Sequence, residues 1–154
     1  MARTKATASE LDQIFIREVN VHYRRTKKKL YKISKAADVA DFVRSILIDN
    51  SREHIVALYL DASHQVASYS IISIGTANSA PVTPREVFQR AVLVGAIAVV
   101  LAHNHPSGST KPSEADGDIT TRIASAGEVL SIKLLDHIIV TDDSHYSFSE
   151  EGRL

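Results

Sequence analysis

The sequence predicts a mixed α/β fold of the α+β kind, in which a central mixed sheet is flanked by helices. Two observations lead to this fold class. Segments with strand-like patterning alternate along the chain with amphipathic segments that have the three- and four-residue spacing of a helix. A short continuous apolar run at 97–101 is typical of a central strand covered on both faces. With 154 residues and 44% apolar content, the chain is expected to form one domain.

The N-terminal part of the chain is expected to be an extension of that domain. Residues 14–23 mix β-branched and aromatic residues with polar ones, and they run into the basic segment 24–29. This pattern predicts a strand followed by a solvated turn. We therefore assign residues 1–29 to an N-terminal extension and residues 30–154 to the main domain.

The next predicted elements are a helix and a hairpin. After Ser34, apolar residues recur at helical spacing and predict an amphipathic helix that ends near residue 49. The stretches 55–60 and 66–74 are rich in β-forming residues and are separated by the short segment 61–64. This spacing predicts an antiparallel hairpin.

Two further helices are predicted from their first turns. Thr83 and Glu86 flank a proline and form a capping box, in which the hydroxyl accepts a backbone N–H and the carboxylate reaches back. Ser113 and Asp116 have the same spacing and open a second helix that ends near Gly127.

The remaining predicted elements are strands. The central strand at 97–101 is expected to end abruptly at His103. The stretches 132–141 and 146–148 supply the last two strands, joined by a polar turn.

Composition excludes several functional classes. The chain contains no cysteine, which excludes a thiol nucleophile and any thiolate zinc site and fits a reducing cytoplasm. Lys plus Arg and Asp plus Glu each total 18, so net charge does not indicate a nucleic-acid or membrane partner. The longest apolar run, 91–102, is shorter than the roughly 20 residues that span a bilayer, and the N-terminus does not resemble a secretory signal. We expect a cytoplasmic protein without a membrane partner.

The segment from His103 to Asp116 predicts a metal site. In an extended backbone, residues two apart point to the same side, so His103 and His105 can reach one ion from the end of a strand. Asp116, in the first turn of the next helix, can supply a third ligand. Two imidazoles and one carboxylate leave a tetrahedral zinc with an open position for water, whose pKa the metal lowers to about 7.

Each half of this pattern also has a simpler interpretation. Ser113 and Asp116 can be only a capping box, and two histidines near a Gly-Pro loop can be incidental. The two halves together, at the exit of an apolar strand and the entry of a helix, favour the metal site. Zinc is preferred over manganese or iron, although two histidines and a carboxylate also suit non-haem iron.

The sequence resembles the JAMM (MPN-type, JAB) metalloprotease family, whose motif is H-x-H-P followed by S-x-x-D, and more closely its RadC branch. The resemblance covers about residues 51–154. It rests on these segments: Tyr59-Leu60-Asp61, Gly75-Thr76, Pro84 to Val87, Ala102 to Gly108, Pro112 to Asp116, Leu135 to Ile139 and Ser147-Phe148.

This resemblance implies a cytidine-deaminase-like JAB/MPN fold and one zinc ion per chain. It also implies hydrolysis of an amide or isopeptide bond in a protein or peptide substrate, with Ser113 assisting the reaction. The family uses an upstream glutamate as general base, at a place that reads Arg52-Glu53-His54 here. Glu53 is our candidate base; if the working position corresponded to His54 instead, proton transfer would be handicapped.

The alternative function is a catalytically weak metal-binding module associated with DNA repair or DNA-bound partners. RadC proteins carry a DNA-repair label, and the basic run 24–29 could contact phosphates. The residues before the domain contain no Gly-rich hairpin of the helix-hairpin-helix type that longer RadC proteins use for DNA. A solvated charge run is the preferred interpretation of 24–29, and a purely structural domain is the least favoured.

Other polar residues are given structural roles. Asp136 and His137 are predicted to be a buried, hydrogen-bonded pair that can brace the metal site from outside. Glu86 is explained by its capping box. Four other histidines are predicted to lie on the polar surface, namely His22, His54, His64 and His145.

Overall fold

The computed structural model describes residues 31–47, 49–75 and 82–154. Its elements in chain order are α1 (Ala36–Ile46), β1 (Glu53–Leu60), β2 (Val66–Gly75), α2 (Pro84–Leu93), β3 (Ala98–Asn104), α3 (Glu114–Leu130), β4 (Lys133–Val140) and β5 (His145–Ser147). The strand predicted at 14–23 and the basic segment 24–29 lie outside the described residues.

The strands form one mixed sheet in the order β2-β1-β3-β4-β5. β1 pairs antiparallel with β2, as the predicted hairpin requires, and it also pairs antiparallel with β3. β3 and β4 are parallel and are connected through α3, and β5 returns antiparallel to β4. The mixed α+β fold predicted from the sequence is confirmed and agrees with a JAB/MPN fold.

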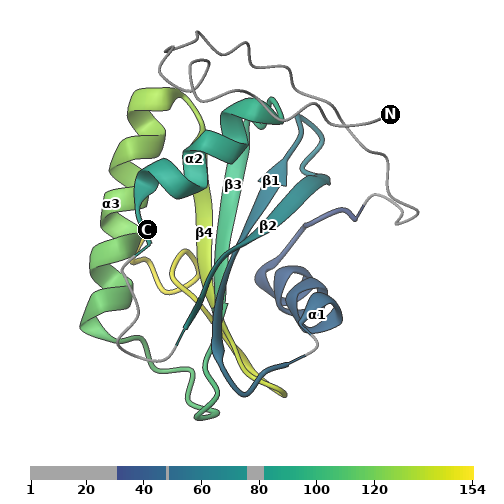
Figure 1. The fold of residues 1–154 in the computed structure, drawn as a ribbon, viewed down its shortest axis with the longest axis vertical. Helices are drawn as coiled ribbons and strands as arrows, with labels where there is room; N and C mark the ends of the chain where they lie inside the picture. Colours follow the sequence, from purple (N-terminus) through teal and green to yellow (C-terminus); the bar gives the residue numbers. More distant parts are fainter. Residues whose placement is uncertain (1–30, 48, 76–81) are drawn as a thin grey trace, which may run out of the picture.

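Helices cover both faces of the sheet, so the central strand has no polar face. Figure 1 shows α1 on one face and α2 with α3 on the other. Along β3, Val100 and Ala102 join the apolar cluster under α1, whereas Val99 and Leu101 join the cluster under α2 and α3. This alternation follows the two-residue side-chain period of a strand, and it explains why the predicted run is continuously apolar.

Several element ends differ from the prediction. α1 ends at Ile46 rather than near residue 49. β3 does not end abruptly at His103 but continues to Asn104. α3 continues past Gly127 to Leu130, and Ser131 closes it in the left-handed conformation with φ 55°. A Cβ at Gly127 would lie 2.5 Å from the carbonyl oxygen of Ile132, so this glycine permits a close approach of the backbone rather than ending the helix.

Within the three described ranges, no helix has the length and apolar character needed to cross a membrane.

Candidate metal centre

Strand β3 and the residue after it carry both histidines of the H-x-H motif. His103 lies on the same face as Val99 and Leu101, under α3, and is only 1% exposed. The backbone N–H of His105 donates to the carbonyl of Val140 at 3.0 Å, which continues the β3–β4 pairing beyond Asn104. The extended backbone therefore directs both imidazoles to the same side.

Helix α3 presents Asp116 to these histidines through its capping box. The hydroxyl of Ser113 accepts the backbone N–H of Asp116 at 3.1 Å. In return, Oδ2 of Asp116 accepts the backbone N–H and the hydroxyl of Ser113, each at 2.7 Å. The cap thus uses one carboxylate oxygen and holds the carboxyl group still.

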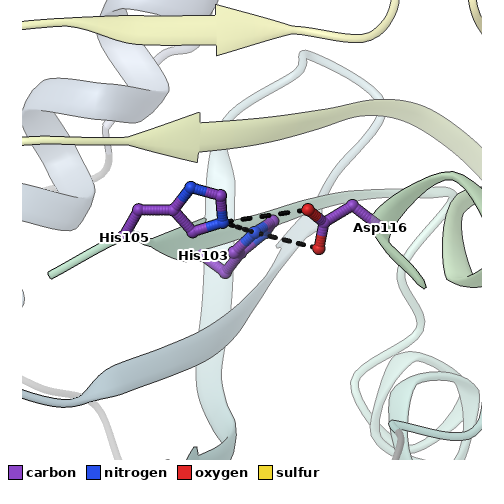
Figure 2. Close-up of side chains that lie close together, drawn as sticks. All are labelled: His103, His105 and Asp116. Atoms are coloured by element: carbon purple, nitrogen blue, oxygen red, sulfur yellow. Dashed lines mark hydrogen bonds and ion pairs between the residues drawn. The ribbon is translucent and has the colours of Figure 1, made fainter. Parts of the chain in front are cut away.

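The other carboxylate oxygen of Asp116 lies beside the imidazole of His103. Oδ1 of Asp116 is 3.2 Å from Nε2 of His103, and Nε2 of His105 is 3.8 Å from Oδ2 (Figure 2). The two Nε2 atoms are 2.9 Å apart. Each residue offers one ligand atom, and these three atoms lie within 4.8 Å of one another. Tetrahedral zinc with Zn–N distances of about 2.0–2.1 Å separates its ligand atoms by roughly 3.3 Å, so the group could hold such an ion.

Polar groups hold the outer side of each imidazole, an exposed one at His105 and buried ones at His103. Nδ1 of His105 donates to the carbonyl of Ser109 at 2.7 Å. Nδ1 of His103 lies 2.8 Å from Nε2 of His137, whose Nδ1 lies 2.6 Å from the hydroxyl of Thr120. Ligating histidines commonly have such partners, which fix the ring orientation.

The electrostatics of the centre favour an ionised carboxylate and a neutral buried imidazole. Burial acts to raise the pKa of Asp116, but the adjacent imidazole of His103 and the hydrogen bonds from Ser113 outweigh it and hold that pKa well below its usual range. Burial lowers the pKa of His137 well below its usual value. The carboxylate is thus charged and available as a ligand at neutral pH.

The start of β1 runs beside the end of β3. Ile55 pairs with His103, so strand alternation places Glu53 on the same face of the sheet as His103. Glu53 is partly buried. His54 is turned to the α1 face and is 6% exposed, and its Nδ1 bonds the carbonyl of Arg52 at 2.8 Å. The prediction that His54 lies on the polar surface is therefore wrong.

Asn104 ties these two strand ends together, a role that the sequence did not reveal in detail. Its Oδ1 accepts the backbone N–H of His54 at 2.7 Å, and its Nδ2 donates to the carbonyl of Arg52 at 2.9 Å. These two backbone groups flank Glu53. Asn104 therefore holds the backbone on both sides of the candidate base.

Two other sequence predictions need correction or addition. Asp136 and His137 are hydrogen-bonded as predicted, but through the backbone: Oδ1 of Asp136 accepts the N–H of His137 at 2.8 Å. Their side chains point to opposite faces of β4, and the other carboxylate oxygen of the partly buried Asp136 accepts from Ser147 at 2.6 Å. His137 does brace the site. Thr120 was not singled out, although its position four residues after Asp116 puts it on the same face of α3.

A hollow of about 690 Å³ lies at the same end of the sheet, on the α1 side. His105 alone of the three candidate ligands contributes to its wall, and it is joined there by Val43, Arg44, Leu47, Asn50, Ser51, Asn104, Pro106, Gly108, Val140, Thr141, Asp142 and Asp143. We place the chemistry at the histidine and aspartate cluster, because the ligand atoms converge there and not in the hollow.

Comparisons with known proteins point to one family. The RadC-like JAB domain family matches residues 33–153. A UPF0758 protein of Chlorobium chlorochromatii is 39% identical over 150 residues, which cover 97% of this chain and 67% of that protein. A UPF0758 protein of Trichlorobacter lovleyi is 43% identical over 130 residues, which cover 84% of this chain and 56% of that protein. The chain thus spans about two thirds or less of the length of these relatives.

Proposed function

This chain belongs to the RadC-like JAB domain family, and on that premise we propose that it is a metal-dependent hydrolase acting on an amide or isopeptide bond of a protein or peptide. The observation that carries the proposal is the convergence of two imidazole nitrogens and one carboxylate oxygen at the end of a buried strand. The donor set suits zinc, held by His103, His105 and Asp116 with one position left open. An open position is typical of a catalytic rather than a structural site.

The bound metal would lower the pKa of water to about 7 and polarise the substrate carbonyl. The residues of the chain then supply the proton transfers. Glu53 accepts one proton as the water oxygen bonds to the carbonyl carbon, and it gives that proton to the amine nitrogen when the C–N bond breaks. Its place on the same face as His103 supports this role, and Asn104 holds the backbone around it.

Ser113 is proposed to stabilise the oxyanion that forms during the attack. Its hydroxyl donates to Asp116 at 2.7 Å, so it must turn away from the carboxylate to donate to substrate. Its backbone N–H, also at 2.7 Å, keeps the carboxylate oxygen bonded during that rotation. The exposed position of Ser113 leaves room for the substrate.

Metal content tests the first half of the proposal. We would purify the chain without a metal-affinity tag and determine metals by elemental analysis, in parallel with a His103→Ala, His105→Ala variant. We expect near-stoichiometric zinc that the variant lacks. A native chain that stays free of metal after zinc is supplied would rule out the hydrolase proposal.

Turnover tests the second half. Linear and isopeptide-linked peptides would be assayed with the native chain, with Glu53→Gln, and with Glu86→Gln as the matched control, since Glu86 is an exposed cap of α2. Loss of the base should lower kcat by about 10²- to 10⁴-fold at unchanged zinc content, whereas the control should keep native kcat. Native turnover in Glu53→Gln would remove Glu53 from the mechanism.

A further inference from the structure

A buried network of hydrogen bonds behind His103 determines which ring nitrogen of His103 carries the proton. Thr120 lies in α3, one turn after Asp116, and His137 lies in β4; both are buried, at 2% and 1% exposure. The aromatic ring of Phe148 stacks on the imidazole of His137 at a centroid distance of 5.0 Å and an interplanar angle of 9°. The ring of His137 is therefore held on one face and at both nitrogens.

The hydrogen bond between Thr120 and Asp116, at one end of this network, determines where the protons lie. The hydroxyl of Thr120 lies 2.6 Å from the backbone carbonyl oxygen of Asp116. A carbonyl can only accept, and two oxygens at this distance without a proton between them would repel each other, so the hydroxyl proton lies on this contact. Thr120 then has only lone pairs to offer to the imidazole of His137.

The same assignment of donors and acceptors extends through His137 to His103. Nδ1 of His137 is 2.6 Å from the hydroxyl oxygen, so this nitrogen must carry the proton and Nε2 must be the acceptor. Nε2 of His137 is 2.8 Å from Nδ1 of His103, which must therefore carry the next proton. Nε2 of His103 is left with a lone pair that points at the candidate metal position.

A single hydrogen bond determines the tautomer of His105. Its Nδ1 faces the carbonyl of Ser109, which can only accept, so its Nε2 also keeps a lone pair. Two nitrogen lone pairs and the Oδ1 atom of Asp116 then converge without a proton among them, an arrangement that a cation stabilises.

We propose that Thr120 and His137 are positioning residues that hold His103 in the Nδ1–H tautomer and so prepare its Nε2 atom to bind the metal. The inference rests on the proposed metal site, but it concerns the proton on the far side of the ring. It assigns a function to a threonine hydroxyl that touches neither metal nor substrate.

Thr120→Val tests the proposal, because valine has nearly the same shape but cannot accept the proton of His137. We expect a loss of zinc affinity of about tenfold, measured by competition with a chromophoric chelator. Thr120→Ser keeps the hydroxyl and should restore native affinity. Thr121→Val is the matched control, since Thr121 makes the same contact to the carbonyl of Gly117, at 3.0 Å, on the exposed side of α3.

The tautomers themselves give a readout that is independent of activity. Correlation of ring protons with ring nitrogens in ¹⁵N-histidine-labelled native chain should show His137 as the Nδ1–H tautomer, both with zinc and without it. Finding His137 as the Nε2–H tautomer, or native zinc affinity in Thr120→Val, would overturn the proposal. If that variant fails to fold, the native spectrum decides alone.

Failure of the two proposals can be told apart. A native chain that binds no zinc removes the proposed function, whereas the tautomers of His103 and His137 in the metal-free chain still test the inference.

Discussion

Helices α2 and α3 begin with the same kind of capping box, yet only the box of α3 lies at a candidate metal site. In α2, Oε2 of Glu86 accepts the backbone N–H and the hydroxyl of Thr83, each at 2.9 Å. In α3, Oδ2 of Asp116 accepts the same two groups of Ser113 at 2.7 Å. Locally the two boxes are equivalent.

The difference lies in the surroundings. Glu86 is exposed, whereas Asp116 is 9% exposed and its second oxygen lies 3.2 Å from Nε2 of His103. One carboxylate oxygen is enough for a cap, so the other is free to serve as a ligand. The cap and the metal site were alternatives when judged from the sequence, but in the fold they are compatible uses of one side chain.

The largest expected difference between the two boxes is in metal affinity. Asp116→Asn removes the negative charge at the ligand position and should weaken zinc binding by more than about 100-fold, beyond the range typical of residues that only support a ligand. Glu86→Gln, the same chemical change in the exposed box, should leave affinity unchanged. Chelator competition measures both, and equal affinities in the two variants would show that Asp116 is only a cap.

The second largest expected difference between the two boxes is in how the unfolding free energy depends on pH. The pKa of Asp116 is lowered on folding, so its stabilisation is complete above the unfolded value near 4 and is lost as the pH falls toward the folded value. Asp116→Asn should therefore flatten the decrease in unfolding free energy between pH 6 and pH 3, which urea unfolding of metal-free protein measures.

Glu86→Gln provides the reference for this experiment. The pKa of Glu86 is also lowered, by hydrogen bonds from Thr83, but the group is exposed and solvent screens it. Its substitution should change the acid dependence less than Asp116→Asn does. A larger change in the Glu86 variant would contradict the electrostatic difference between the two boxes.

The smallest expected effect comes from the capping hydroxyl, which the two boxes have in common. Thr83→Ala and Ser113→Ala each remove a hydroxyl that accepts the N–H of the third helical residue, and each should lower the unfolding free energy of the metal-free protein by about 1 kcal/mol. Denaturant unfolding compares the two. A cost for Ser113→Ala several times that for Thr83→Ala would mean that the boxes differ even locally.

The sequence by itself determined the elements and the candidate ligands. Strand and helix periods, capping boxes and the two-residue spacing of His103 and His105 depend on neighbours within a few residues, so they can be read along the chain. The hairpin, the central buried strand and the fold class were predicted on this basis and agree with the structure. The element ends were less certain, as the continuation of α3 past Gly127 shows.

Only the tertiary structure decided which polar residues meet. His137 and Thr120 lie 34 and 17 positions from their partners His103 and His137, and Asn104 bonds residues 50 and 52 positions away. Such contacts depend on strand register and on how α3 packs over β4, and no local period encodes either of them. The sequence singled out Asp116 as a ligand because it opens the helix that follows the two histidines, but only the packing of α3 over the sheet brings its carboxylate to 3.2 Å from Nε2 of His103.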